Sequence, residues 1–127
     1  MGFSYEQRGF TRVPFEERPS VTLTSEGGRV ITGNLVDLSM TGAMVECSEP
    51  FDADEVCVIL IKVNDDMTLE MRGTVARVDS DSLGVMFTGI SGDSYEALHE
   101  LLVDNAEDKD AVRNEVFERA HLAPDLY

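Results

Sequence analysis

Two short motifs carry side chains suited to binding an anionic ring system. Residues 8–12 have the pattern R-x-x-x-R and supply Arg8 and Arg12, and residues 37–42 have the pattern D-x-S-x-x-G. A guanidinium is planar, forked and always charged, so it can pair with a phosphate, stack on a purine, or donate to guanine O6 and N7. The carboxylate of Asp37 only accepts hydrogen bonds, which suits guanine N1–H and the exocyclic amine. Together the motifs are suited to holding a guanine nucleotide.

Each motif also has a plain structural interpretation. Exposed arginines are ordinary, so Arg8 and Arg12 alone are more typical of a solvated N-terminal arm. In the second motif, Ser39 can donate to a phosphate or a purine nitrogen, and Gly42 lets the backbone approach a ring without a Cβ clash. Asp, Ser and Gly are equally common in turns, so this motif alone fits a turn and a ligand site equally well.

The charge balance restricts the kinds of partner. The 127 residues include 25 acidic and 10 basic ones, for a net charge of −15, which argues against binding DNA, RNA or anionic lipid. Residues 1–20 are neutral overall, whereas residues 93–127 carry −7. An anion site therefore has to be built locally, near the first motif. No apolar run is long enough for a membrane span and the first ten residues lack an apolar signal core, so we expect a cytoplasmic protein with no membrane insertion.

The sequence gives little support for catalysis or metal binding. Cys47 and Cys57 are ten residues apart in strand-like segments, and His99 and His121 are distant from both. Two thiols in such a chain are typical of core residues, so we expect no metal site and no cofactor. Neither a Walker loop nor a Ser/His/Asp or Cys/His set is present, so we expect no catalytic residues and no enzyme activity.

Alternating apolar residues predict six strands with no helix between them. We expect strands over residues 21–24, 29–37, 43–47, 56–63, 69–78 and 83–87. Residues 56–63 are apolar on both faces, as in a buried central strand, and Gly73 is expected at a bulge or a close backbone contact. This pattern predicts a mainly β fold, a small antiparallel barrel.

Two helices are expected after the last strand. Asp93, with Glu96 three residues later, fits an N-cap and capping box, and residues 97, 98, 101 and 102 form one apolar face. A second helix is expected over residues 106–120, with an apolar stripe at Val112, Val116, Phe117 and Ala120. The first 19 residues and residues 122–127 show no periodicity, so we expect an irregular arm and an irregular tail.

The ordered set of motifs resembles the signature of PilZ domains, which bind cyclic di-GMP in bacteria. The resemblance includes the two motifs, the segments 33–39 and 42–45 around the second one, and the segments 73–77 and 83–87. It extends over about residues 8–103. It implies a six-stranded antiparallel β-barrel followed by a helix, and it implies that Arg8 and Arg12 clamp the guanines and phosphates while Asp37, Ser39 and Gly42 form the other wall. Gln7 departs from the family pattern, because many members have a second basic residue there.

The resulting domain hypothesis has three parts: a flexible arm over residues 1–19, the barrel and its helix over residues 20–103, and an additional helix and tail over residues 104–127. The leading functional hypothesis is a cyclic di-GMP receptor, in which the ligand orders the arm over the barrel and changes a surface read by a downstream protein. The alternative is an adaptor that binds a protein without any ligand. Arg77 is either a ligand contact or a partner of a neighbouring acid, and the second role is favoured. Phe10 either stacks on a base or anchors the arm.

Overall fold

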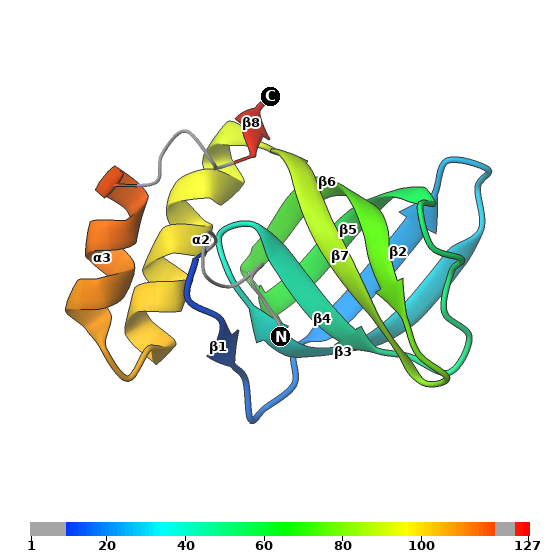
Figure 1. The fold of residues 1–127 in the computed structure, drawn as a ribbon, viewed down its shortest axis with the longest axis horizontal. Coiled ribbons are helices and arrows are strands. Elements are labelled where there is room, and N and C mark those ends of the chain that lie inside the picture. Colours follow the sequence, from blue (N-terminus) through cyan, green and yellow to red (C-terminus); the bar gives the residue numbers. More distant parts are fainter. Residues whose placement is uncertain (1–9, 119–123) are drawn as a thin grey trace.

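The structure is a computed structural model that describes residues 10–118 and 124–127. Six strands in this part of the chain close into an antiparallel barrel: β2 (Ser20–Ser25), β3 (Val30–Leu38), β4 (Gly42–Glu46), β5 (Val56–Asn64), β6 (Met67–Val78) and β7 (Ser82–Ile90). Their order is β3-β2-β5-β6-β7-β4, and β4 pairs again with β3, which closes the barrel. Figure 1 shows the barrel beside a pair of helices. The predicted fold class is confirmed.

The barrel core comes from the alternation of side chains along each strand. In β2, Val21 and Leu23 are fully buried, while Thr22 and Thr24, which alternate with them, are partly exposed. The prediction that β5 is buried on both faces is wrong, because Val56 is 46% and Val58 37% exposed. A barrel strand needs only one apolar face, and valine is tolerated on the outer one.

Three register shifts bend the strands that surround the candidate site. One lies in β3 between Leu35 and Asp37, and two lie in the β6–β7 pairing, next to Gly73 and between Val75 and Arg77. The expectation for Gly73 is confirmed, since a Cβ there would lie 2.5 Å from Val85 Cγ1 and 2.8 Å from the Met86 carbonyl oxygen.

Two helices follow the barrel. Helix α2 (Gly92–Asn105) packs Leu98, Leu102 and Val103 toward the core. The predicted cap at Asp93 is wrong: the N-cap is Ser91, whose Oγ accepts from the Ser94 N–H at 3.2 Å, and Asp93 lies in the first turn. Ser91 has the extended backbone that an N-cap requires, so the helix begins at Gly92.

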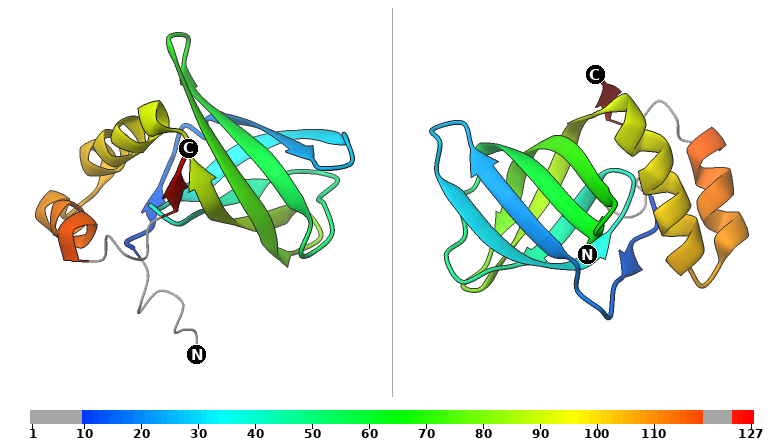
Figure 2. Two further views of the ribbon diagram at one scale, coloured as in Figure 1. Left: turned by 90° about the horizontal axis from the view of Figure 1, so that it is seen from above. Right: turned by 180° about the vertical axis from the view of Figure 1, so that it is seen from behind.

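Helix α3 (Lys109–Glu118) packs on α2, which lies between α3 and the barrel in both views of Figure 2. It begins three residues later than predicted, because Ala106 caps the C-terminus of α2 with an N–H bond to the Val103 carbonyl. Val112 of the predicted stripe is buried; the side chains of the other three stripe positions lie outside the described part. No helix in the described ranges is long and apolar enough to cross a bilayer.

Both ends of the described chain pair with the barrel, in contrast to the irregular segments that were predicted. β1 (Val13–Pro14) pairs with β3, and β8 (Asp125–Leu126) lies parallel to β7. Strands of two residues have no periodicity, so the sequence pattern could not reveal them. Phe10, Val13 and Phe15 are buried, and Phe10 therefore anchors this part of the arm on the core.

Candidate functional site

A straight row of four residues crosses the outer face of the barrel. The Cα partners along it are Asp37 in β3, Met44 in β4, Gly84 in β7 and Arg77 in β6. Asp37 and Arg77 thus stand at the two ends, while Met44 and Gly84 lie between them. Because Gly84 has no side chain, the middle of the row is low and largely apolar.

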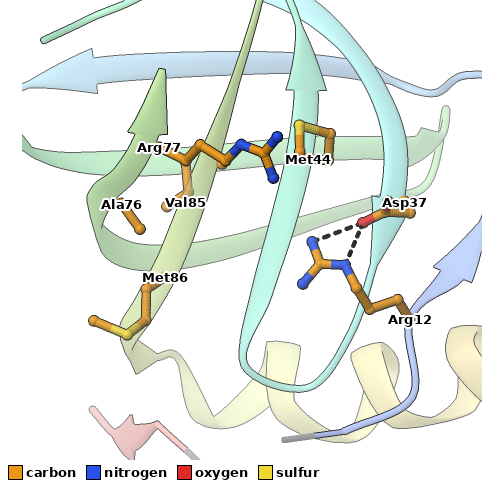
Figure 3. A pocket seen from close by; sticks show the side chains of 8 residues that line it. Arg12, Asp37, Met44, Ala76, Arg77, Val85 and Met86 are labelled. Carbon is orange, nitrogen blue, oxygen red and sulfur yellow. Dashed lines mark hydrogen bonds and ion pairs between the residues drawn. The ribbon is translucent and has the colours of Figure 1, made fainter. Parts of the chain in front are cut away.

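A pocket of about 410 Å³ lies over this row. Its lining consists of Arg12, Asp37, Met44, Ala76, Arg77, Gly84, Val85 and Met86. Figure 3 shows Arg12 and Asp37 facing each other, with the Arg77 side chain extending from β6 toward Met44. The pocket therefore has a charged rim and an apolar floor, an arrangement typical of small-molecule sites.

The Arg12 guanidinium and the Asp37 carboxylate form the best-defined polar contact of the pocket. Arg12 Nη2 lies 2.7 Å and Nε 2.9 Å from Asp37 Oδ1. Both side chains are only about one-fifth exposed, at 20% and 24%, so salt screens the pair less than an exposed one. The buried neighbours Phe10 and Val13 fix the position of Arg12. The pairing of β1 with β3, in which Pro14 is the partner of Asp37, fixes the position of Asp37. The structure thus joins one residue of each predicted motif.

The other members of the second motif build the turn between β3 and β4. Ser39 is 1% exposed, and its Oγ accepts from the backbone N–H groups of Thr41 at 3.1 Å and Gly42 at 3.2 Å. The Ser39 N–H in turn donates to the Gly42 carbonyl at 2.8 Å. In this structure these two residues hold the turn that follows Asp37, and neither lines the pocket. Arg8 of the first motif lies outside the described residues.

Arg77 combines the two roles that its sequence position left open. Its Nε lies 3.6 Å from Asp79 Oδ2, and its side chain is 70% exposed, so the ion pair contributes little. It also lines the pocket opposite Asp37. The cation is therefore weakly held and available at the far end of the row.

Two features of the site were not predicted from the sequence: the floor of the pocket and the contact between Thr11 and Glu115. Met44 and Gly84 carry no charge and lie in segments that look like ordinary strands, so only the strand register reveals them. Glu115 of α3 accepts hydrogen bonds from Thr11, the residue before Arg12. The two residues are 104 positions apart, and no local pattern signals such a contact.

The two cysteines lie away from the pocket lining. Both thiols are free and buried, as expected of core residues. Burial, and to a smaller degree the charge of Glu55, raises the pKa of Cys57 to about 11. Burial and Asp81 likewise raise the pKa of Cys47. These thiols are therefore protonated and unreactive at neutral pH. Among the described residues, no group of three or more His, Cys, Asp or Glu side chains is placed to hold a metal ion.

Several solved structures share this fold, and two of those described below are PilZ domains. The PilZ domain of CeSA from a cellulose-synthesizing bacterium is 23% identical, with a TM-score of 0.61 over 74% of this chain and 96% of its own. The PilZ domain of YcgR from Escherichia coli, solved with c-di-GMP, is 14% identical, with a TM-score of 0.59 over 88% and 95%. The Bacillus subtilis inhibitor of motility MotI/DgrA is 16% identical, with a TM-score of 0.60; the match covers 86% of this chain and about half (52%) of MotI/DgrA.

Similarity at these identities shows the fold alone, and the family assignment rests on the sequence. No match was found among curated proteins. The sequence matches the PilZ domain family over residues 6–104, which is most of the chain and includes both motifs. The resemblance noted from the motifs is thereby confirmed. The chain belongs to the PilZ domain family.

Proposed function

We propose that this protein is a receptor for cyclic di-GMP that binds the nucleotide over the row Asp37–Met44–Gly84–Arg77. The observation that carries this proposal is the meeting of the two motifs at one pocket, through the contact between Arg12 and Asp37. The PilZ domain of YcgR, which has the same fold, was solved with this ligand. Family membership and local geometry thus support the same ligand.

The chemistry of the rim fits a guanine dinucleotide. The Asp37 carboxylate has a second oxygen that can accept from guanine N1–H and its exocyclic amine. Arg12 and Arg8 can donate to guanine O6 and N7 or to the phosphates. A base can lie flat over Met44 and Gly84, because no side chain rises from Gly84. Ser39 and Gly42 support this site indirectly, because they hold the turn that follows Asp37.

The same geometry explains how an anion can bind to a protein with a charge of −15. In the structure, Asp37 neutralises much of the charge of Arg12. When guanine donates hydrogen bonds to the Asp37 carboxylate, the Arg12 guanidinium pairs with a phosphate of the ligand. The ligand therefore exchanges one set of charge-assisted hydrogen bonds for another, so the gross strength of these bonds exceeds the net affinity.

The signal that we propose is a change in the arm. Residues 10–19 already lie against the barrel, with Phe10, Val13 and Phe15 buried. The ligand-dependent change that we expect therefore involves the side chains of Arg8 and Arg12 and not the docking of residues 10–19. A protein partner would bind the altered surface that the arm and the nucleotide form together. The nucleotide shifts the population of arm arrangements because it binds one of them more tightly than the others. In this scheme the protein is a receptor and adaptor, with no catalytic step.

Calorimetric titration of the purified chain tests the proposal. Cyclic di-GMP should give a saturable heat, whereas cyclic di-AMP should give none, because adenine lacks the O6 acceptor and the N1–H donor of guanine. Arg12→Ala should abolish the heat while the chain stays folded. An absence of heat with wild-type protein at tens of micromolar would rule out the proposal.

The ligand-independent adaptor remains the second candidate, and one observation favours it. Arg12 and Asp37 satisfy each other within the protein, so both motif residues have a structural role without any nucleotide. In that case Arg12→Ala would lower the free energy of unfolding but would leave capture of the partner unchanged, with or without nucleotide. The calorimetric result separates the two candidates.

A further inference from the structure

We infer that Glu115 of α3 is a positioning residue for ligand binding, because it fixes the arm so that Arg12 faces the pocket. Glu115 Oε1 accepts from the Thr11 N–H at 2.8 Å, and Oε2 accepts from the Thr11 hydroxyl. One carboxylate thus holds the backbone and the side chain of the same residue. This inference rests on the proposed function, and it assigns a role to a helix that begins after the 6–104 family match.

The contact fixes the arm at the position adjacent to the proposed ligand residue. Phe10 and Val13 are buried on either side, and β1 pairs Val13 with Leu38. Between these anchors, Thr11 is exposed, and Glu115 accepts hydrogen bonds from its backbone and its side chain. Arg12 is the next residue in the chain, so fixing the backbone of Thr11 restricts the position from which the Arg12 side chain reaches Asp37.

Glu115 is itself placed by a continuous set of contacts that leads back to the barrel. The Lys109 ammonium donates to the carbonyls of Val103 at 2.8 Å and Asp104 at 3.0 Å, which joins the start of α3 to the end of α2. Val112 buries its side chain in the core cluster. At the other end of α2, the Ser94 hydroxyl accepts from the Glu70 N–H of β6 at 2.9 Å. The carboxylate is therefore presented to the arm by a helix whose position is fixed.

The sign of the expected effect separates positioning from simple electrostatics. Removing a negative charge from a protein of charge −15 should strengthen the binding of a dianionic nucleotide. Removing a positioning contact should weaken binding, because the ligand must then order the arm as it binds. Asp110 provides the matched control: it is an exposed acid on the same helix, and its contact is with Arg113, not with the arm.

The experiment compares Glu115→Ala, Thr11→Val and Asp110→Ala in the full chain. We expect the Kd for cyclic di-GMP to rise about tenfold in Glu115→Ala and about threefold in Thr11→Val, which keeps its N–H. Asp110→Ala should bind as tightly as wild type or slightly more tightly. Glu115→Gln, whose amide oxygen can accept one of the two bonds, should restore part of the affinity.

A second readout needs no ligand. Amide hydrogen exchange at Thr11 should become at least about tenfold faster in Glu115→Ala than in wild type, while exchange in the barrel strands stays unchanged. If wild type binds and the Kd of Glu115→Ala is unchanged or lower, the positioning role is wrong and the proposed function stands. If wild type shows no binding while exchange at Thr11 accelerates, the proposed function fails and Glu115 is shown to fix the arm. Unchanged exchange at Thr11 would overturn the inference outright.

Discussion

Arg12 contacts a single carboxylate oxygen of Asp37 through two nitrogens, Nη2 at 2.7 Å and Nε at 2.9 Å. This contact places a cation and an anion side by side at one end of a low apolar row, with a second cation, Arg77, at the other end. A nucleotide with two guanines and two phosphates needs groups of both signs.

The affinity for cyclic di-GMP should depend on the planar, two-donor shape of the Arg12 guanidinium as well as on its charge. Lys keeps the charge but cannot present two N–H groups from one plane, so Arg12→Lys should weaken cyclic di-GMP binding by about 10- to 100-fold. Arg12→Ala should weaken it further. Calorimetry on both variants checks this order. Arg18→Lys is the control, because Arg18 lies outside the pocket lining and pairs with Glu46; if Arg12→Lys bound like wild type, the bidentate role would be wrong.

A side chain on the floor of the pocket should block the ligand without harming the fold. The Cβ position at Gly84 is open, since its nearest neighbour is Arg77 Cβ at 3.6 Å. Gly84→Val should therefore change the free energy of unfolding by less than about 1 kcal/mol. It should raise the Kd at least about tenfold, because the new methyl groups occupy the place of a base.

Gly27→Val is the matched control for that prediction, because Gly27 lies in the turn between β2 and β3, outside the pocket lining, and a Cβ there would come no closer than 3.9 Å to Ser25 Oγ. It should likewise change the free energy of unfolding by less than about 1 kcal/mol, and it should leave the Kd unchanged. Urea unfolding and calorimetry on both variants make the comparison. Normal binding by Gly84→Val would show that the ligand lies elsewhere.

Ser39 should act through the turn and therefore through stability. Ser39→Ala removes a buried acceptor for the N–H groups of Thr41 and Gly42, which should cost about 1–3 kcal/mol. Thr41→Val removes the neighbouring hydroxyl but leaves both backbone contacts, so it should cost less. Urea unfolding measures both values. A Ser39→Ala protein of normal stability that had lost cyclic di-GMP binding would instead show that this hydroxyl contacts the ligand directly.

Cys57 should make the protein less stable at alkaline pH. Burial raises its pKa from 9.0 to about 11, so the folded state keeps a proton that the unfolded chain releases. The contribution of Cys57 is therefore complete below pH 9.0 and is lost as the pH rises through about 11. The free energy of unfolding, measured across this range, should fall more steeply for wild type than for Cys57→Ala. Parallel curves would contradict the prediction.

The barrel could be predicted from the sequence because apolar and polar residues alternate along most of its strands. Val21 and Leu23 point inward between threonines, and Gly73 stands where two backbones come close. Both features are local, so they are visible in the sequence. Ser91 was missed as a cap because Asp93 and Glu96 offered an equally good local pattern two residues later. β1 and β8 are stabilised by pairing with the barrel, and a segment of two residues has no pattern of its own.

Only part of the candidate site could be predicted from the sequence, because the rest depends on contacts between residues far apart in the chain. Arg12 and Asp37 belong to motifs with distinctive residue types, and the structure brings them together. Met44, Gly84 and Arg77 line up with Asp37 only through the strand register, which depends on the bulges in β3 and β6. The contact between Glu115 and Thr11 depends on how α3 packs, and this packing involves residues far apart in the sequence.

Amide chemical shifts recorded during a titration with cyclic di-GMP test the central claim most directly, because they report binding and location together. The account predicts saturable shifts at Arg12, at residues 37–42, and at Met44, Gly84 and Arg77. It predicts little change at Val30, at the end of β3 far from Asp37, and at Val56 and Val58 of β5. Saturable shifts confined to other surfaces, or no shifts at millimolar nucleotide, would contradict it.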